Sequence, residues 1–170
     1  DLPMEVVSTP REMREAVATY MSRAVEKMRR QGLVTASISV FVNTNRFREH
    51  DAQYYGSQTV RLGIATADTA KLIRAALYGL SRIWRPGFSY KKAGVICLDL
   101  HQAAKQQGAL FHQADDPGRL ELMRLMDELN RRYGRGSIAF AAAGVKKEWA
   151  LRSEHLSGRY STNQNELLSV

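Results

Sequence analysis

The 170-residue chain is long enough for one ordinary domain and a small appendage, and short for two full domains. No apolar run approaches the roughly 18–20 residues that cross a bilayer, and Cys97 is the only cysteine, which excludes an internal disulfide. The net charge is +8, with most of the excess in residues 1–100, and this favours a polyanionic partner such as nucleic acid. The single cysteine and the lack of a signal-like segment at the start fit a reducing cytoplasm. Because the chain begins at Asp1 without an initiator Met, we expect it to be part of a longer protein.

The first predicted element is a long helix. Thr9 is the expected N-cap, Pro10 the first helical residue and Glu12 the partner that completes a capping box. Gly32 ends the helix after two arginines. Its apolar residues recur at helical spacing and predict a core-facing stripe: Met13, Val17, Tyr20, Met21, Ala24, Val25 and Met28.

Two stretches with a period of two follow. In Val34–Thr44 the residues Ala36, Ile38, Val40 and Val42 point one way, and Ser37, Ser39, Phe41 and Asn43 point the other. After a loop through 45–56, Val60, Leu62 and Ile64 face inward, whereas Thr59, Arg61 and Gly63 face outward. We therefore predict a hairpin with one buried face and one wet face.

A second helix is capped by Asp68 or Thr66 and ends at Pro86 and Gly87. Its apolar positions are Leu72, Ile73, Ala76, Leu77, Leu80, Ile83 and Trp84. A further strand runs from Tyr90 to about Leu100, with Ala93, Val95 and Cys97 inward and Lys92, Gly94 and Ile96 outward.

This order of elements predicts an α+β fold. Met4–Val7 is a candidate for a shortened first strand, and with it the order becomes the split βαββαβ arrangement, a sheet with two helices on one face and the other face open. A third helix follows, with Leu122, Leu125, Met126, Leu129 and Tyr133 on one side, and then a short strand at Ser137–Ala141 and an irregular tail.

No catalytic or metal-binding constellation emerges from the sequence. His50, His101, His112 and His155 lack the spacing of a metal site. Asp115 and Asp116, beside Pro117, are interpreted as a solvated linker plus a charge at a helix N-terminus. Cys97 is expected to act as a small buried hydrophobe.

The open face of the sheet is the more informative feature. Arg61 and Lys92 project from it, and Ser37, Ser39 and Gly63 are small enough for a nucleic-acid backbone to approach. Further cations lie near the strand ends: Arg46, Arg48, Arg85 and Lys91. This pattern fits a track for DNA phosphates; a sheet face kept soluble by its charges is an equally open alternative. A sheet that recognises RNA would present paired aromatics, and Phe41 alone qualifies.

Collinear blocks of the sequence resemble a known family. Residues 13–32, 37–47, 54–100 and 122–144, and the tail 149–170, resemble in order the C-terminal region of UmuC, the catalytic subunit of the bacterial error-prone DNA polymerase V, a Y-family translesion polymerase. Together they cover nearly the whole chain. Two departures are that Met4–Val7 alone represents the first strand, and that Gly158 and Ser161 stand where the family has Pro and Thr.

The resemblance implies a domain organisation and a function. Residues 1–101 would be the little finger domain, which grips primer-template duplex through its sheet; 102–118 a linker with a clamp-binding peptide; and 119–170 a C-terminal extension. The catalytic palm with its Mg²⁺ ions would lie outside this chain, so the chain itself is expected to be non-enzymatic and to hold no cofactor. Translesion synthesis in the SOS response, at the bacterial nucleoid, is the implied setting.

The stretch "QQGALF" provides the clamp peptide. Gln107, Leu110 and Phe111 are similar to the family's sliding-clamp motif, in which Leu and Phe anchor in an apolar cleft and Gln fixes the register. Packing of Leu110 and Phe111 on the third helix is the alternative. For the tail, UmuD′ and RecA are the implied partners. A second functional hypothesis is a protein-interaction module for the clamp, UmuD′ or RecA without significant DNA binding.

Overall fold

The computed structural model describes residues 2–48, 50–103, 115–145 and 149–150 of the chain. Its elements are β1 (Leu2–Val7), α1 (Pro10–Arg30), β2 (Leu33–Thr44), β3 (Tyr55–Thr66), α2 (Thr69–Ile83), β4 (Tyr90–Gln102), α3 (Pro117–Tyr133) and the 3₁₀ turn η2 (Ala141–Ala143). The predicted α+β class and the βαββαβ order are both confirmed.

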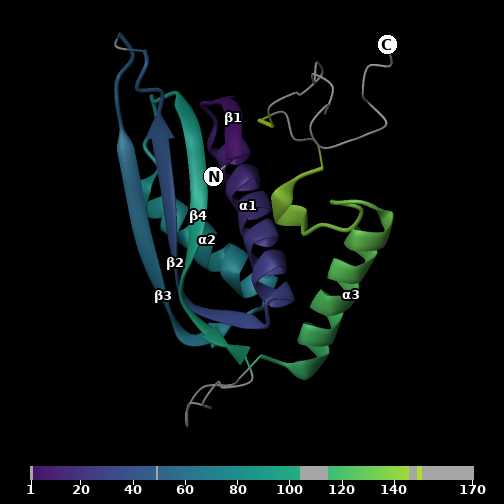
Figure 1. The fold of residues 1–170 in the computed structure, drawn as a ribbon. Coiled ribbons are helices and arrows are strands. Elements are labelled where there is room, and N and C mark those ends of the chain that lie inside the picture. Colours follow the sequence, from purple (N-terminus) through teal and green to yellow (C-terminus); the bar gives the residue numbers. More distant parts are fainter. Residues whose placement is uncertain (1, 49, 104–114, 146–148, 151–170) are drawn as a thin grey trace, which may run out of the picture.

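The four strands form one antiparallel sheet in the order β1-β4-β2-β3 (Figure 1). Ile38 pairs with Cys97 on one side and with Val60 on the other, which sets the register of the central strands. The first strand is longer than the expected Met4–Val7: it spans Leu2–Val7 and pairs with β4, Leu2 opposite Ala93. The sheet is therefore completed by β1.

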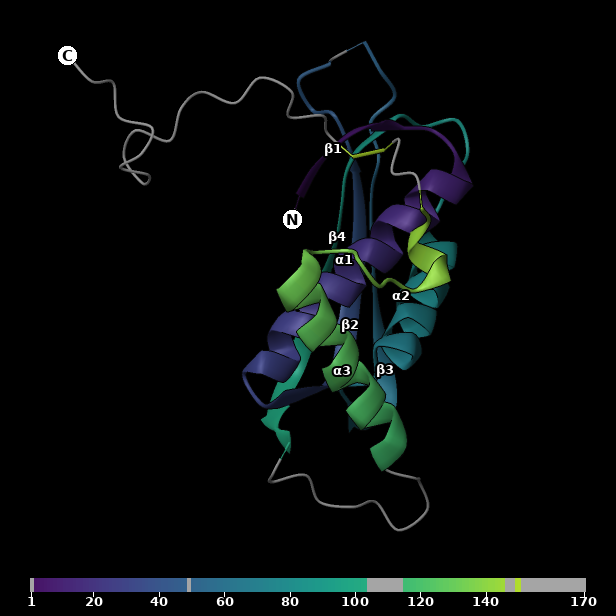
Figure 2. The same cartoon turned by 90° about the vertical axis from the view of Figure 1, so that its right-hand side faces the viewer.

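α1 and α2 lie side by side against one face of the sheet and leave the other face bare (Figures 1 and 2). The alternation of β2 directs Ile38, Val40 and Val42 into the layer between sheet and helices, where all three are fully buried. The helices bury their predicted stripes against them: Met13, Val17, Met21 and Val25 from α1, and Leu72, Ile73, Ala76, Leu80 and Ile83 from α2.

Both helices begin where the sequence predicts. Thr9 caps α1: its Oγ1 accepts from the Glu12 backbone N–H at 3.3 Å and donates to the Glu12 carboxylate at 2.7 Å. Asp68, of the two candidates, caps α2, accepting from the backbone N–H groups of Ala70 and Lys71. Gly32 has a φ of +67°, a left-handed conformation that suits glycine at the end of α1.

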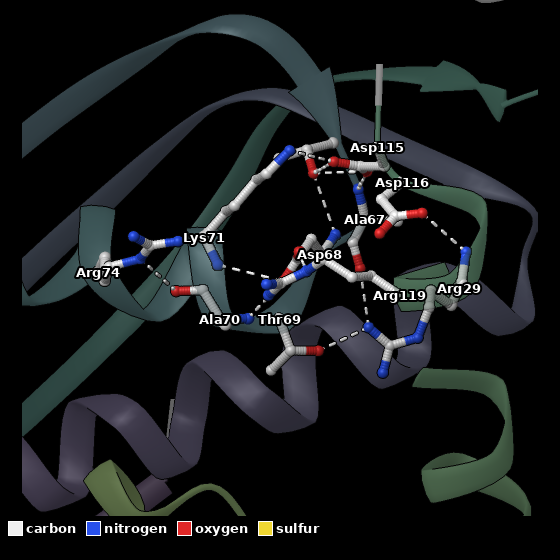
Figure 3. Close-up of polar contacts among 12 residues, drawn as sticks. Arg29, Ala67, Asp68, Thr69, Ala70, Lys71, Arg74, Asp115, Asp116 and Arg119 are labelled. Carbon is white, nitrogen blue, oxygen red and sulfur yellow. Dashed lines mark hydrogen bonds and ion pairs between the residues drawn. The ribbon is translucent and has the colours of Figure 1, made fainter. Parts of the chain in front are cut away.

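α3 lies on the outer side of α1 and α2, away from the sheet (Figures 1 and 2). The interpretation of Asp115 as solvated was wrong: its carboxylate accepts from the Thr66 hydroxyl, the Ala67 N–H and the Lys71 ammonium (Figure 3). Asp116 is the N-cap of α3, as expected. Polar contacts thus fix the start of α3 to the region around the N-terminus of α2.

Only part of the predicted apolar stripe of α3 faces the body of the protein, since Met126 and Leu129 are half-buried. Met123 is the buried residue of α3, whereas Leu122, Leu125 and Tyr133 are more than half exposed. The orientation is set by ion pairs: the guanidinium of Arg29 holds both carboxylate oxygens of Asp127 at 2.7 Å, and Arg119 bonds Asp68. Periodicity locates an apolar stripe, but these charged contacts decide which side packs.

The predicted strand at Ser137–Ala141 was also wrong. Ile138 donates its N–H to the Asn130 side chain at 2.9 Å, and the Asn130 amide donates to the Ile138 carbonyl at 2.8 Å, so the backbone here bonds to α3 instead of a strand edge. The chain then places Trp149 against α1, where its ring meets Tyr20 edge-to-face with centroids 5.5 Å apart. No described helix is long and apolar enough to span a membrane.

Candidate nucleic-acid interface

The bare face of the sheet can be read as four cross-strand rows, because paired residues project to the same side. From one end to the other, across β3, β2 and β4, the rows are Arg61–Ser37–Leu98, Thr59–Ser39–Ile96, Ser57–Phe41–Gly94 and Tyr55–Asn43–Lys92. We call this surface the open face. It mixes hydroxyl groups, apolar side chains and two cations.

The two predicted cations lie at opposite ends of the open face. Arg61 and Lys92 are both exposed, and neither forms an ion pair with another described residue. Their row partners on β2, Ser37 and Asn43, are six residues apart, which corresponds to about 20 Å along a strand. The open face therefore presents two separated positive charges that have no partner within the described chain.

The two predicted serines are bonded within the sheet. Ser37 is buried and donates to the Asp99 carboxylate at 2.5 Å, and Asp99 itself has a positive φ of 47°. The Ser39 hydroxyl lies 3.3 Å from that of Ser57. Both predicted serines are therefore buried and bonded within the sheet, and Asp99 adds a carboxylate near the Arg61 end.

A bulge distorts β3 beside Arg61. Ser37 pairs with Arg61, but Thr35 pairs with Thr66, so β3 carries extra residues between these pairs. The exposed Gly63 lies in this segment. The bulge also shifts the alternation: Ala65, instead of the predicted Ile64, packs against the core. Sequence periodicity could not locate this shift.

The cations predicted near the strand ends differ in their surroundings. Arg46 and Arg48 lie in the loop between β2 and β3, where Arg48 forms a 3.7 Å ion pair with Asp51. The Arg85 guanidinium stacks 4.8 Å from the Tyr54 ring centroid. Lys91 is half-buried, one residue before Lys92. The structure therefore places Arg46, Arg48 and Lys91 at the same end of the sheet as Lys92.

Sequence reasoning placed Phe41 and Ile96 on the open face but missed Tyr55. Tyr55 is 58% exposed in the row of Lys92, and Ile96 is 49% exposed in the centre. Phe41 covers Gly94. The period-two pattern placed Phe41 and Ile96 outward, and extending it two residues back from Ser57 could have found Tyr55.

The remaining predictions concern the clamp-binding residues, a metal site and Cys97. Gln107, Leu110 and Phe111 lie outside the described residues. Within the described ranges, no group of three or more His, Cys, Asp or Glu side chains could hold a metal ion. Cys97 packs against the core, and burial raises the pKa of its thiol, as expected for a structural cysteine.

The fold and the open face define an α+β domain of the little finger type: a four-stranded sheet with two helices on one face and the other face available for contact. Residues 4–110 match the impB/mucB/samB family C-terminal domain, and residues 121–170 match a domain of unknown function, DUF4113. This chain belongs to the impB/mucB/samB family.

Curated relatives agree with this assignment over nearly the whole chain. UmuC of Salmonella typhimurium is 39% identical over 167 residues, which is 98% of this chain and 40% of that protein. MucB of Escherichia coli is 35% identical over 157 residues, covering 92% and 37% of the two chains, and SamB of Salmonella typhimurium is 37% identical over 159 residues, covering 93% and 37%. The chain thus spans about two fifths of the length of these relatives.

Proposed function

We propose that this chain grips duplex DNA through its open face as part of an error-prone Y-family DNA polymerase of the UmuC type. The observation that carries the proposal is the pair of unpartnered cations, Arg61 and Lys92, at the two ends of a sheet face that no described element covers. Such a face can follow a sugar-phosphate backbone, because cations hold phosphates without reading bases. Binding would depend strongly on salt and weakly on sequence.

The function of the parent protein extends this proposal. Residues 1–101 would act as the little finger domain and 119–170 as the C-terminal extension, while polymerisation with Mg²⁺ would belong to a palm domain outside these residues. The role of this chain is then retention of the polymerase on damaged primer-template DNA during translesion synthesis in SOS repair. The family assignment and the position of the match in UmuC support this view.

Tethering to the sliding clamp forms the second part of the proposal. Gln107, Leu110 and Phe111 lie in the 102–118 linker, whose flanks are attached to the domain: the Ala103 N–H donates to the Gly32 carbonyl at 2.9 Å, and the Asp115 carboxylate bonds Lys71 at 2.7 Å. A clamp peptide between two attached flanks would bring the open face to DNA that already passes through the clamp, which raises its effective concentration.

A second candidate function is a protein-interaction module for the clamp, UmuD′ or RecA, without significant DNA binding. The observation in its favour is the outer side of α3, where Leu122, Leu125 and Tyr133 stay more than half exposed. Apolar side chains that recur on one side of a helix are typical of surfaces that a partner covers. DNA affinity separates the two candidates.

The decisive experiment measures duplex binding by fluorescence anisotropy over a series of salt concentrations, with two unrelated DNA sequences. We expect log Kd to rise linearly with log salt, and Arg61→Ala or Lys92→Ala to reduce the slope by about one each on both sequences. Arg82→Ala, an exposed cation of α2 in the helix layer, is the matched control. Affinity that is independent of salt, or equal losses in all three variants, would contradict the grip.

Clamp binding is tested separately by titrating the chain against a bacterial sliding clamp. The variant carries Gln107→Ala, Leu110→Ala and Phe111→Ala, with folding checked by circular dichroism. Loss of binding in this variant alone supports the tether. Equal clamp binding by both proteins, or by neither, would contradict the tether and favour the alternative, in which Leu110 and Phe111 pack within this chain.

A further inference from the structure

The loop between β2 and β3 presents an aromatic ring to solvent. Phe47 is 95% exposed, far more than the other described aromatic side chains. A single exposed apolar residue on a flexible loop would need no explanation. Here, however, the described loop residues on both sides of Phe47 are hydrogen-bonded, so the ring is presented on a bonded segment.

The hydrogen bonds of the loop converge on Gln53. Its Nε2 donates to the carbonyls of Asn45 at 3.1 Å and Arg48 at 2.9 Å, while its Oε1 accepts from the Thr44 hydroxyl at 2.9 Å. The Asn45 side chain accepts from the Phe47 N–H at 3.1 Å. A ring presented on a loop that is already ordered loses little conformational entropy when it binds.

The two residues next to the ring in the sequence are arginines, in a loop that also carries Glu49 and Asp51. Arg46 and Arg48 flank the ring; Arg46 forms no ion pair with a described residue, and the Arg48–Asp51 pair is long and exposed, hence weak. The loop closes onto the end of the open face, where the Thr44 hydroxyl donates to the Gln53 side chain and the next row holds Asn43, Tyr55 and Lys92. The exposed rings of Phe47 and Tyr55 therefore belong to the same end of the sheet as Arg46, Arg48, Lys91 and Lys92.

Aromatic rings combined with cations are the chemistry that binds unpaired nucleotides. An exposed ring stacks on the face of a base, and arginines hold the adjacent phosphates or stack themselves. In a duplex the base faces are already stacked on their neighbours, so a ring on a surface loop can reach them only in a single strand. A protein partner would be expected to meet a continuous apolar patch, whereas Phe47 is bordered by arginine on both sides.

We propose that Phe47, together with Arg46 and Arg48, binds unpaired nucleotides by base stacking at the end of the sheet. The site would take the single-stranded segment that adjoins the duplex on the open face, and this adjacency rests on the proposed DNA grip. Stacking itself does not depend on Arg61. Tyr55, in the row of Lys92, offers a second ring on the path from the loop to the open face.

The experiment compares three fluorescent DNA probes at one salt concentration, using the whole chain. The probes are a blunt duplex, the same duplex with a short thymidine overhang, and the same duplex with an abasic overhang of equal length. We expect the thymidine overhang to bind on the order of tenfold more tightly than the other two. Phe47→Ala should abolish this gain and leave blunt-duplex affinity unchanged.

Two further variants make the readout specific. Phe47→Trp should keep the gain, and its added indole fluorescence should be quenched on binding the thymidine overhang and not the abasic one. Tyr78→Ala removes an exposed aromatic ring from α2, which covers the opposite face of the sheet, and should change nothing.

The outcomes separate this inference from the proposed function. A blunt duplex that binds well without any gain from the thymidine overhang, or a gain that survives Phe47→Ala, overturns the Phe47 site alone. If Phe47→Ala abolishes the gain from the thymidine overhang, the Phe47 site is supported. If Arg61→Ala and Lys92→Ala leave the blunt-duplex affinity unchanged at the same time, the proposed DNA grip is contradicted. Failure to bind any of the three probes overturns both the Phe47 site and the duplex grip. Contact of Phe47 with a partner protein would then be the role left for its exposed ring.

Discussion

The ring of Phe41 lies directly above Gly94, in the place where a side chain at that position would begin. A Cβ built on Gly94 would lie 2.4 Å from Cζ of Phe41 and 2.6 Å from Cε1, well inside contact distance. Phe41 and Gly94 pair across β2 and β4 in the middle of the open face. The absence of a side chain at Gly94 therefore leaves the space that the Phe41 ring occupies in the middle of the open face.

Gly94→Ala is expected to displace this ring and destabilise the fold by about 1–3 kcal/mol, the usual cost of overpacking. Urea denaturation measures the change, and the DNA titration shows whether the raised ring also weakens binding. Gly118→Ala is the control, since a Cβ there meets the Asp116 side chain at an ordinary 3.6 Å. A loss of stability no larger than that of the control would mean that Phe41 moves aside without cost.

Arg29 joins three parts of the chain, so its removal should loosen α3. Its guanidinium bonds Asp127 of α3, the Ala67 carbonyl at 2.8 Å and the Thr69 hydroxyl at 2.6 Å, and its side chain is only 12% exposed. Arg29→Ala leaves a poorly solvated carboxylate and should cost about 2–4 kcal/mol. Arg29→Lys should recover little, because an ammonium cannot form the two-pronged contact.

Hydrogen exchange identifies where Arg29→Ala acts. We expect faster exchange of the α3 amides, with the amides of β2 and β4 almost unchanged. A double-mutant cycle with Asp127→Ala gives the coupling energy of the pair. Additive effects of the two substitutions would show that the contact does not stabilise the docking of α3.

The Asp68–Arg119 contact predicts a loss of stability in acid. Burial pushes the pKa of Asp68 up, but the hydrogen bonds from Arg119 and from the N–H groups of Lys71 and Ala70 outweigh it and leave this pKa below its ordinary value of 3.8. A carboxylate with a depressed folded-state pKa contributes stability that is present above about pH 4 and lost as the pH falls further.

Asp68→Asn separates the charge from the helix cap. Asparagine keeps an oxygen that can cap α2, but it cannot ionise and cannot form the ion pair with Arg119. The variant should be less stable than the natural chain at neutral pH, and its urea midpoint should fall less steeply below about pH 4. Parallel pH profiles for the two proteins would assign the acid sensitivity to other carboxylates.

Trp149 offers a test of how the end of the chain packs. It is 4% exposed, meets Tyr20 edge-to-face, and its Nε1 has no hydrogen-bond partner among the described residues. Trp149→Ala should cost about 3–5 kcal/mol through the cavity that it leaves. Trp149→Phe keeps an aromatic contact and removes the buried donor, so thermal denaturation should show a much smaller loss. Equal losses would mean that the indole N–H does find a partner.

Local patterns in the sequence determined the folded core of this protein. The helical spacing of α1 and α2, the cap at Thr9, and the alternation of β2 and β4 placed these elements and most of their inward residues correctly, because each depends on neighbours a few positions away. Ala36, predicted inward, is an exception: the register shifts between Thr35 and Ser37, and Thr35 is the fully buried residue. The outward direction of Arg61 and Lys92 followed from the same alternation. The length of β1 was underestimated, because pairing with β4 extends it beyond its own apolar run.

Tertiary contacts decided what local spacing could not. The side of α3 that packs is selected by Arg29 and Asp68, which reach Asp127 and Arg119 across 98 and 51 positions of sequence. The bulge at Gly63 and the ordered loop that presents Phe47 likewise depend on pairings between strands and on the Gln53 amide. A sequence pattern shows which residues are apolar or charged, whereas the free energy of long-range packing and ion pairing determines which of them meet.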